Sequence, residues 1–262
     1  MKEVIEIQIW QFLCIYLLLL LILAIMRKCK VDKSKMLLMA SFKMTIQLAL
    51  AGFILTYIFD NPHLIFTIAY LVAMISFTIY RVLKQQPQLN NRFKLIIAGS
   101  IAFSGLFTIF YFIFIVVGNN AFTPQYVIPI SGMLMGNTMT GVSLGLKTFV
   151  EALKDQKYRI EALSCAGVAA DKILLPFVKQ GLETAILPTL NSMLGMGIVS
   201  LPGMMTGQML AGTLPTTAIL YQIAIIISIC ATVCLSCFIA LYFGSKTLYG
   251  HKRQIINLNE QA

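Results

Sequence analysis

Long runs of apolar residues, broken by short polar segments, fill almost the whole chain. A helix needs roughly 20 predominantly apolar residues to cross the hydrocarbon core of a bilayer. Windows of this kind are found at 7–26, 36–59, 62–80, 95–117, 126–146, 184–210 and 216–243. The pattern therefore predicts an all-α, polytopic membrane protein with about seven transmembrane helices, folded as a single domain over residues 1–262.

The fifth and sixth windows are the least apolar, so five or six spans is an alternative count. These windows contain the stretches GMLMGNTMTG, residues 132–141, and LPGMMTGQMLAG, residues 201–212. The first window follows Glu3 and Glu6 and precedes a basic cluster. That arrangement favours a retained span over a cleaved signal peptide.

Composition and charge place the chain in a membrane rather than on a nucleic acid. Hydrophobic residues make up 58% of the sequence and charged residues 11%, with a mean hydropathy of +0.84, outside the range of ordinary soluble domains. The net charge is +10, but nearly all Lys and Arg fall in the segments 27–35, 81–94, 147–179 and 246–253. The short segments between spans on the other side carry none. This sorting predicts an amino terminus outside and a carboxyl terminus in the cytoplasm, hence an odd number of spans.

Motifs for catalysis and for bound cofactors are missing from the sequence. It contains no phosphate loop, no H-E-x-x-H and no G-x-S-x-G, so we expect no enzyme and no cofactor on this chain. His63 and Asp60 share a short outer turn, which makes a catalytic pair there a remote alternative. Cys230, Cys234 and Cys237 fall on one face of the last helix and could bind a soft metal, although packing as small apolar residues is the favoured interpretation.

Three stretches resemble the FetB (YbbM) family of ABC-transporter permeases. They are VIPISGMLMGNTMT at 127–140, ILPTLNSMLGMGIVSLPGMMTGQMLAG at 186–212 and YQI at 221–223, with a weaker likeness at 46–59. The resemblance implies a plasma-membrane permease that exports iron or another metal and works as a homodimer. It also implies a separate, FetA-like ATP-binding subunit, on which ATP and Mg²⁺ would bind. The resemblance also extends to plant relatives that are linked to aluminium tolerance and to UDP-glucose transport. A non-metal substrate such as a nucleotide sugar is therefore an alternative.

The polar segment 147–183 is expected to be a cytoplasmic coupling element. Its pattern favours amphipathic helix with breaks at Gly167 and Pro176, and the stretch EALSCAG resembles the start of the coupling-helix motif of bacterial ABC permeases. The resemblance assigns ATPase coupling to Glu161, Ala162 and Gly167. A helix that simply lies on the membrane face is the alternative.

The stretches at 132–141 and 201–212 predict a transport path through the bundle. Gly132, Gly136, Gly141 and Gly145 have the spacing that lets helices approach closely. Helix flexibility is assigned to Gly132, Gly136, Pro188, Pro202, Gly203 and Gly207. Polar residues in lipid are costly, so the pathway candidates are Asn137, Thr138, Thr140, Asn191, Thr206 and Gln208. Met135, Met139 and Met205 are candidate metal ligands, with gap filling as the favoured alternative.

Acidic side chains are almost missing from the predicted spans, which argues against a site for a bare hard cation. A soft or chelated metal, or a neutral or anionic substrate, fits the predicted lining at least as well. A channel or secondary carrier that works without ATP would use the same polar residues.

Overall fold

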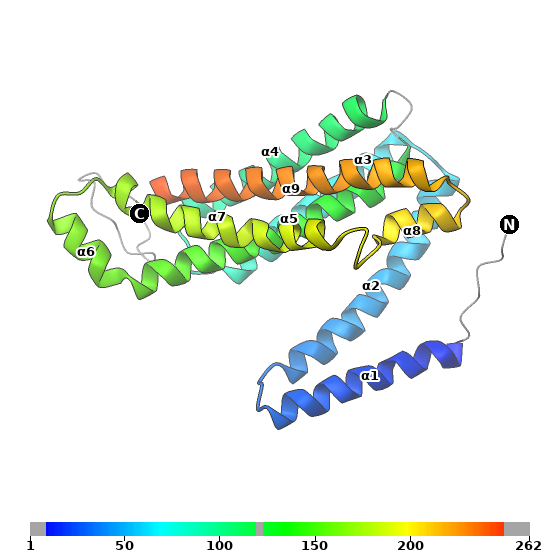
Figure 1. Ribbon diagram of the computed structural model, residues 1–262, viewed down its shortest axis with the longest axis horizontal. Coiled ribbons are helices and arrows are strands. Elements are labelled where there is room, and N and C mark those ends of the chain that lie inside the picture. Colours follow the sequence, from blue (N-terminus) through cyan, green and yellow to red (C-terminus); the bar gives the residue numbers. More distant parts are fainter. Residues whose placement is uncertain (1–8, 119–122, 249–262) are drawn as a thin grey trace. The chain divides into compact units, whose positions relative to one another are not determined.

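The computed structural model describes residues 9–118 and 123–248, and the regular structure among them is helical (Figure 1). The chain divides into two compact units, Met1–Asn61 and Pro62–Ala262. The all-α prediction is therefore confirmed, whereas the single membrane domain stays a prediction.

The first unit is a helical hairpin of α1 (Ile9–Lys28) and α2 (Ser34–Asp60). The Tyr16 hydroxyl lies 2.6 Å from Thr45 Oγ1 and ties the two helices together. Lys43 lies inside α2 with an exposed side chain, so this one basic residue departs from the sorting of charge into loops.

The second unit contains the remaining helices. They are α3 (Leu64–Gln85), α4 (Asn91–Tyr111) with its π-helical continuation η1 (Phe112–Val117), α5 (Pro124–Asp155), α6 (Lys157–Cys165), α7 (Ala170–Gly195), α8 (Gly203–Leu210) and α9 (Pro215–Lys246). Local signals explain several ends. Asn90 caps α4 by accepting a 2.7 Å hydrogen bond from the Phe93 N–H, and Pro124 and Pro215 occupy first turns, where a missing N–H costs nothing.

Membrane spans are clearest for α2, α3, α4 with η1, and α9, which are long and apolar enough to cross a bilayer by length and composition. The helices α5 and α7 have 32 and 26 residues, but both contain polar stretches. Among the described residues, six of the seven helices of twenty or more residues correspond to predicted windows, whereas α7 overlaps the window 184–210 only in part. The number of spans and their orientation stay predictions.

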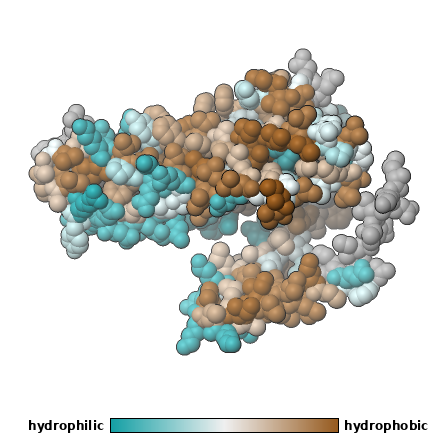
Figure 2. Space-filling view, in the orientation of Figure 1, coloured by the Kyte–Doolittle hydropathy of each residue, from teal (hydrophilic) through white to brown (hydrophobic). Residues whose placement is uncertain are grey.

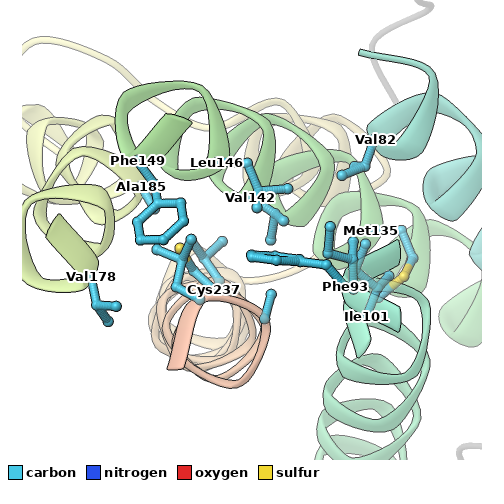
Figure 3. Packing of buried hydrophobic residues seen from close by; sticks show 14 of the residues in the cluster. Val82, Phe93, Ile101, Met135, Val142, Leu146, Phe149, Val178, Ala185 and Cys237 are labelled. Carbon is cyan, nitrogen blue, oxygen red and sulfur yellow. The ribbon is translucent and has the colours of Figure 1, made fainter. Parts of the chain in front are cut away.

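Close packing of α5 with α7 and α9 forms the centre of the second unit (Figure 3). A Cβ at Gly141 would come 2.9 Å from the Ala185 carbonyl oxygen, and one at Gly145 would come 2.8 Å from that of Gly181. This confirms close helix approach at Gly141 and Gly145. The pairing of 141 with 185 and of 145 with 181 also shows that α5 and α7 run antiparallel.

The predicted sixth span, 184–210, is wrong as a single helix. The helix α7 begins earlier, at Ala170, and ends at Gly195, and a non-helical turn separates it from the short helix α8. Gly197 has a φ of +84°, a left-handed conformation that glycine adopts without strain, and Pro202 sits at the N-cap of α8. Regular helix is therefore interrupted between Gly195 and Gly203, and the assigned flexibility of Pro202 and Gly203 stays a prediction.

Candidate coupling surface and transport path

The coupling segment predicted at 147–183 is built from parts of three helices. It consists of the last turns of α5, all of α6 and the first half of α7. The expected break at Pro176 is wrong, because α7 continues through it. Proline removes one backbone hydrogen bond, and the packing of α7 against α5 and α9 outweighs that loss.

Gly167 does break the chain as predicted, and its geometry shows how. Its φ is +78°, its N–H donates to the Ser164 carbonyl and the Val168 N–H donates to the Leu163 carbonyl, both at 3.1 Å. This pair of hydrogen bonds is a Schellman motif, which ends α6. No atom lies within 4 Å of the position that a Cβ would take, so Gly167 provides the turn rather than a close contact.

The three residues assigned to coupling lie together on an exposed surface. Glu161 and Ala162 are exposed on α6, and Gly167 is exposed directly after it. Lys157 Nζ lies 3.8 Å from Glu161 Oε1, a solvent-exposed pair that contributes little to stability. Figure 2 shows hydrophilic residues gathered at the α6 end of the second unit, whereas the middle of the bundle is hydrophobic. The surface is therefore open to a soluble partner.

The pathway candidates on α5 point to two different sides. Asn137 and Thr140 share an exposed face, where their side chains bond to the carbonyls of Met133 at 2.8 Å and Gly136 at 3.2 Å. Thr138 is fully buried, and its hydroxyl has no hydrogen-bond partner among the described residues. A path along α5 would therefore run over the face of Asn137 and Thr140.

The other pathway candidates lie on α7 and α8. Asn191 is exposed on α7, whereas Thr206 and Gln208 are half-buried on α8. The Thr206 hydroxyl donates to the Pro202 carbonyl at 2.7 Å, and Gln208 Oε1 is buried with no donor among the described residues. Of the six candidates, Asn137, Thr140 and Asn191 are thus exposed on α5 and α7, Thr138 is buried on α5, and Thr206 and Gln208 are half-buried on α8.

The residues assigned to flexibility have different environments. Gly132 faces the methyl group of Met74, which would lie 3.3 Å from a Cβ, whereas Gly136, Gly203 and Gly207 face open space. Pro188 lies within α7, which remains helical around it. Among the residues assigned to flexibility, Pro202 and Gly203 are the ones that lie at the break between α7 and α8.

The candidate sulfur ligands mostly pack. Met135 is buried beside Phe93 and Ile101 (Figure 3), and its Cε would lie 2.5 Å from a Cβ at Gly105. Met139 and Met205 are respectively half-buried against the core and buried. Cys237 packs against Gly145 at the α5–α9 contact. Within the part of the chain that the structure describes, no group of three or more His, Cys, Asp or Glu side chains is placed to hold a metal.

Buried hydroxyls on α4 and α9 were not predicted. Ser104 on α4 hydrogen-bonds to Ser236 on α9. Ser100, Thr108, Ser228 and Thr232 are also buried on these two helices. The four-residue spacing of these hydroxyls in two strongly apolar windows was the available signal, because a polar stripe on one helix face must find partners inside a membrane.

Gln222 on α9 is a further buried polar residue that the pathway prediction omitted. It is 6% exposed, its Nε2 points to Met196 Sδ at 3.9 Å, and its Oε1 has no donor among the described residues. Because Met196 opens the turn between α7 and α8, Gln222 contacts the chain where α7 ends.

Comparison with known proteins agrees with this architecture. Residues 9–249 match the family described as "Uncharacterised protein family (UPF0014)". The chain belongs to the UPF0014 family. It is 28% identical to UPF0014 membrane protein YjkA of Bacillus subtilis (strain 168), covering 92% of this chain and 94% of that protein. No solved structure matches it.

Two other UPF0014 relatives cover similar shares. The chain is 32% identical to UPF0014 membrane protein slr1647 of Synechocystis sp., over 86% of this chain and 85% of that protein. It is 29% identical to "Probable iron export permease protein FetB" of Escherichia coli (strain K12), over 91% and 92%. The resemblance to the FetB family is thus confirmed, and the chain is a multi-pass membrane protein.

Proposed function

We propose that this chain is the membrane-spanning permease subunit of an ABC transporter, that a separate ATP-binding subunit drives it, and that it exports iron or another metal. The observation that carries the proposal is the exposed surface of Glu161, Ala162 and Gly167 at the joined ends of α5 and α7. The same two helices carry Asn137, Thr140 and Asn191. Movement of the ATP-binding subunit against this surface would therefore be transmitted to α5 and α7, the helices that carry these path residues.

The likeness to FetB over nearly the whole chain supports a permease, and supports a metal as its cargo. The sequence has no phosphate loop, so ATP would be hydrolysed on the partner. The part of the chain that the structure describes lacks a cluster of acidic or thiolate ligands. The cargo would accordingly be held by the amide and hydroxyl groups of the path, which are weak ligands for a metal.

Exposure of polar groups within α5 and α7 supports a homodimer. Asn137, Thr140 and Asn191 are exposed although they lie in predicted spans, where contact with lipid is costly. A second copy of the chain would cover them and place the path at the seam between copies.

Purification of the tagged chain from membranes tests the proposal. We expect an ATP-binding subunit to co-purify with it, and the mass of the complex to correspond to two copies of each subunit. Ala162→Trp should abolish ATPase stimulation, because it adds bulk at the surface without straining an α-helix. Leu175→Trp is the control, since Leu175 is already large and exposed on α7.

Three results would contradict the proposal. One is purified chain that moves metal in vesicles without ATP, which would indicate a channel or carrier. Another is an Ala162→Trp complex with normal ATPase stimulation. The third is a wild-type chain that never retains an ATP-binding subunit, provided that it elutes as a folded, monodisperse species.

A further inference from the structure

A pocket opens between α6 and the first half of α7, and neither the path nor the coupling motif accounts for it. Its free volume is about 190 Å³. Sites for nucleotides and other drug-sized ligands usually measure roughly 300–1,000 Å³. The pocket is therefore of a size to receive one large side chain rather than a whole small molecule.

The lining has an apolar floor and a basic rim. The floor includes Ile160, Ile173 and Phe177, which are buried. Arg159 and Lys172 stand at the rim with exposed side chains, and Arg159 Nη1 donates to Gln156 Oε1 at 3.1 Å. No lining residue is acidic. An apolar group accompanied by a negative charge is the complementary ligand.

The register of α5 and α7 places the pocket beyond the end of the predicted fifth span. Gly145, one residue before the end of the fifth apolar window, lies against Gly181. Because the helices are antiparallel, residues 172–180 of α7 lie beyond that level, beside the part of α5 that extends to Asp155. Residues 147–155 of α5, which follow the end of the window at 146, add about 13 Å at 1.5 Å per residue.

Exposed charges at the same level support this placement. Lys147 pairs with Glu151 and Lys179 with Glu183, each at 3.8 Å and each with both side chains largely exposed. Such a belt of charge of both signs is typical of a helix surface in water. Lipid acyl chains would not reach a pocket at that level, which favours a soluble protein as the occupant.

We propose that the pocket is a socket for one apolar side chain, flanked by a carboxylate, on the surface of the ATP-binding subunit. This rests on the proposed function, which supplies that partner. The socket adjoins the coupling surface, since Val168 at its edge follows Gly167 directly and Leu163 follows Ala162. The partner thus contacts α6 on its exposed face and inserts one side chain behind it, so that α6 and α7 move together.

Titration of purified permease with the ATP-binding subunit that co-purifies tests the socket. Val168→Phe places bulk at the pocket, and Arg159→Glu/Lys172→Glu reverses the charge of the rim. Each should raise the Kd at least about tenfold, as loss of a central interface contact does. Leu175→Phe and Lys154→Glu/Lys179→Glu are matched changes outside the lining, and should stay within about twofold of wild type.

Salt dependence separates the two parts of the lining. The Kd of the wild type and of Val168→Phe should rise with ionic strength, whereas that of the charge-reversed rim should not rise. A photo-crosslinking residue at Gln180, on the rim, should attach to a peptide of the ATP-binding subunit that has an apolar residue beside Asp or Glu. The same crosslinker at Leu175 should give no such adduct.

The outcomes distinguish the socket from the wider proposal. If wild type binds the ATP-binding subunit and both pocket variants bind equally well, the socket is overturned and the permease function stands. Adducts at Gln180 that contain phospholipid and no protein would likewise overturn it in favour of a lipid site. If no ATP-binding subunit binds the folded wild type, both ideas fail. Unchanged elution and melting temperature of each variant exclude misfolding as the cause of a lost interaction.

Discussion

Gly145 and Gly136 belong to the same small-residue series, but the structure gives them opposite roles. A Cβ at Gly145 would lie 2.7 Å from Cys237 Sγ, 2.8 Å from the Gly181 carbonyl oxygen and 3.1 Å from Ala185 Cβ. A Cβ at Gly136 would meet nothing within 4 Å. Gly→Ala at each position therefore makes a matched pair on one helix.

The expected difference follows from these contacts. Alanine improves helix propensity at both positions by about 1 kcal/mol, so this gain cancels in the comparison. Overpacking at Gly145 costs about 1–3 kcal/mol, because a backbone carbonyl cannot rotate away as a side chain can. Gly145→Ala should thus be less stable than Gly136→Ala by about 1–3 kcal/mol. At about 2–4 °C per kcal/mol for a chain of this size, its melting temperature should be lower by roughly 2–12 °C.

Thermal unfolding of both variants in the same detergent, followed by intrinsic fluorescence, measures this difference. Adding Cys237→Ala to Gly145→Ala should restore only part of the loss, since the Gly181 carbonyl oxygen remains in place. Equal melting temperatures for the two single variants would refute the assigned contact of α5 with α7 at Gly145. So would a full rescue by Cys237→Ala, which would show that the sulfur alone is the obstacle.

Two further predictions concern topology and the path. Gln125 and Gln85 are exposed beside predicted loops that face opposite sides of the membrane. In a background without native cysteines, Gln125→Cys should therefore react with a membrane-impermeant thiol reagent from outside the cell, and Gln85→Cys only after permeabilisation. The reverse pattern would overturn the orientation. Asn137→Leu should abolish metal tolerance at unchanged melting temperature, because the Asn137 amide is exposed. Met135→Leu should retain transport and change the free energy of unfolding by less than about 1.5 kcal/mol, because Met135 packs on Gly105. Normal metal tolerance in Asn137→Leu would remove Asn137 from the path.

Local rules explain which parts of the site were predictable. Gly167 was found because a left-handed turn at the end of a helix needs glycine, and that requirement is visible in the chain itself. Pro176 was misjudged because a proline inside a helix breaks it only when packing does not hold the helix together. Whether packing does so depends on α5 and α9, which are distant in sequence. The pocket between α6 and α7 was missed for the same reason, since its floor combines Ile160 with Ile173 and Phe177.

The sequence by itself determined the class of the protein, the approximate places of most of its long helices and the turn at Gly167. Hydrophobic periodicity and backbone restrictions act over a few residues, so they can be evaluated on the chain alone. Only the tertiary structure decided that Gly145 meets Gly181, that Met135 is buried against Gly105, and that Asn137 is exposed whereas Thr138 is buried. These outcomes depend on which helix faces meet, and many pairings bury similar apolar area. The close approaches that backbone shape and small residues permit select one of them.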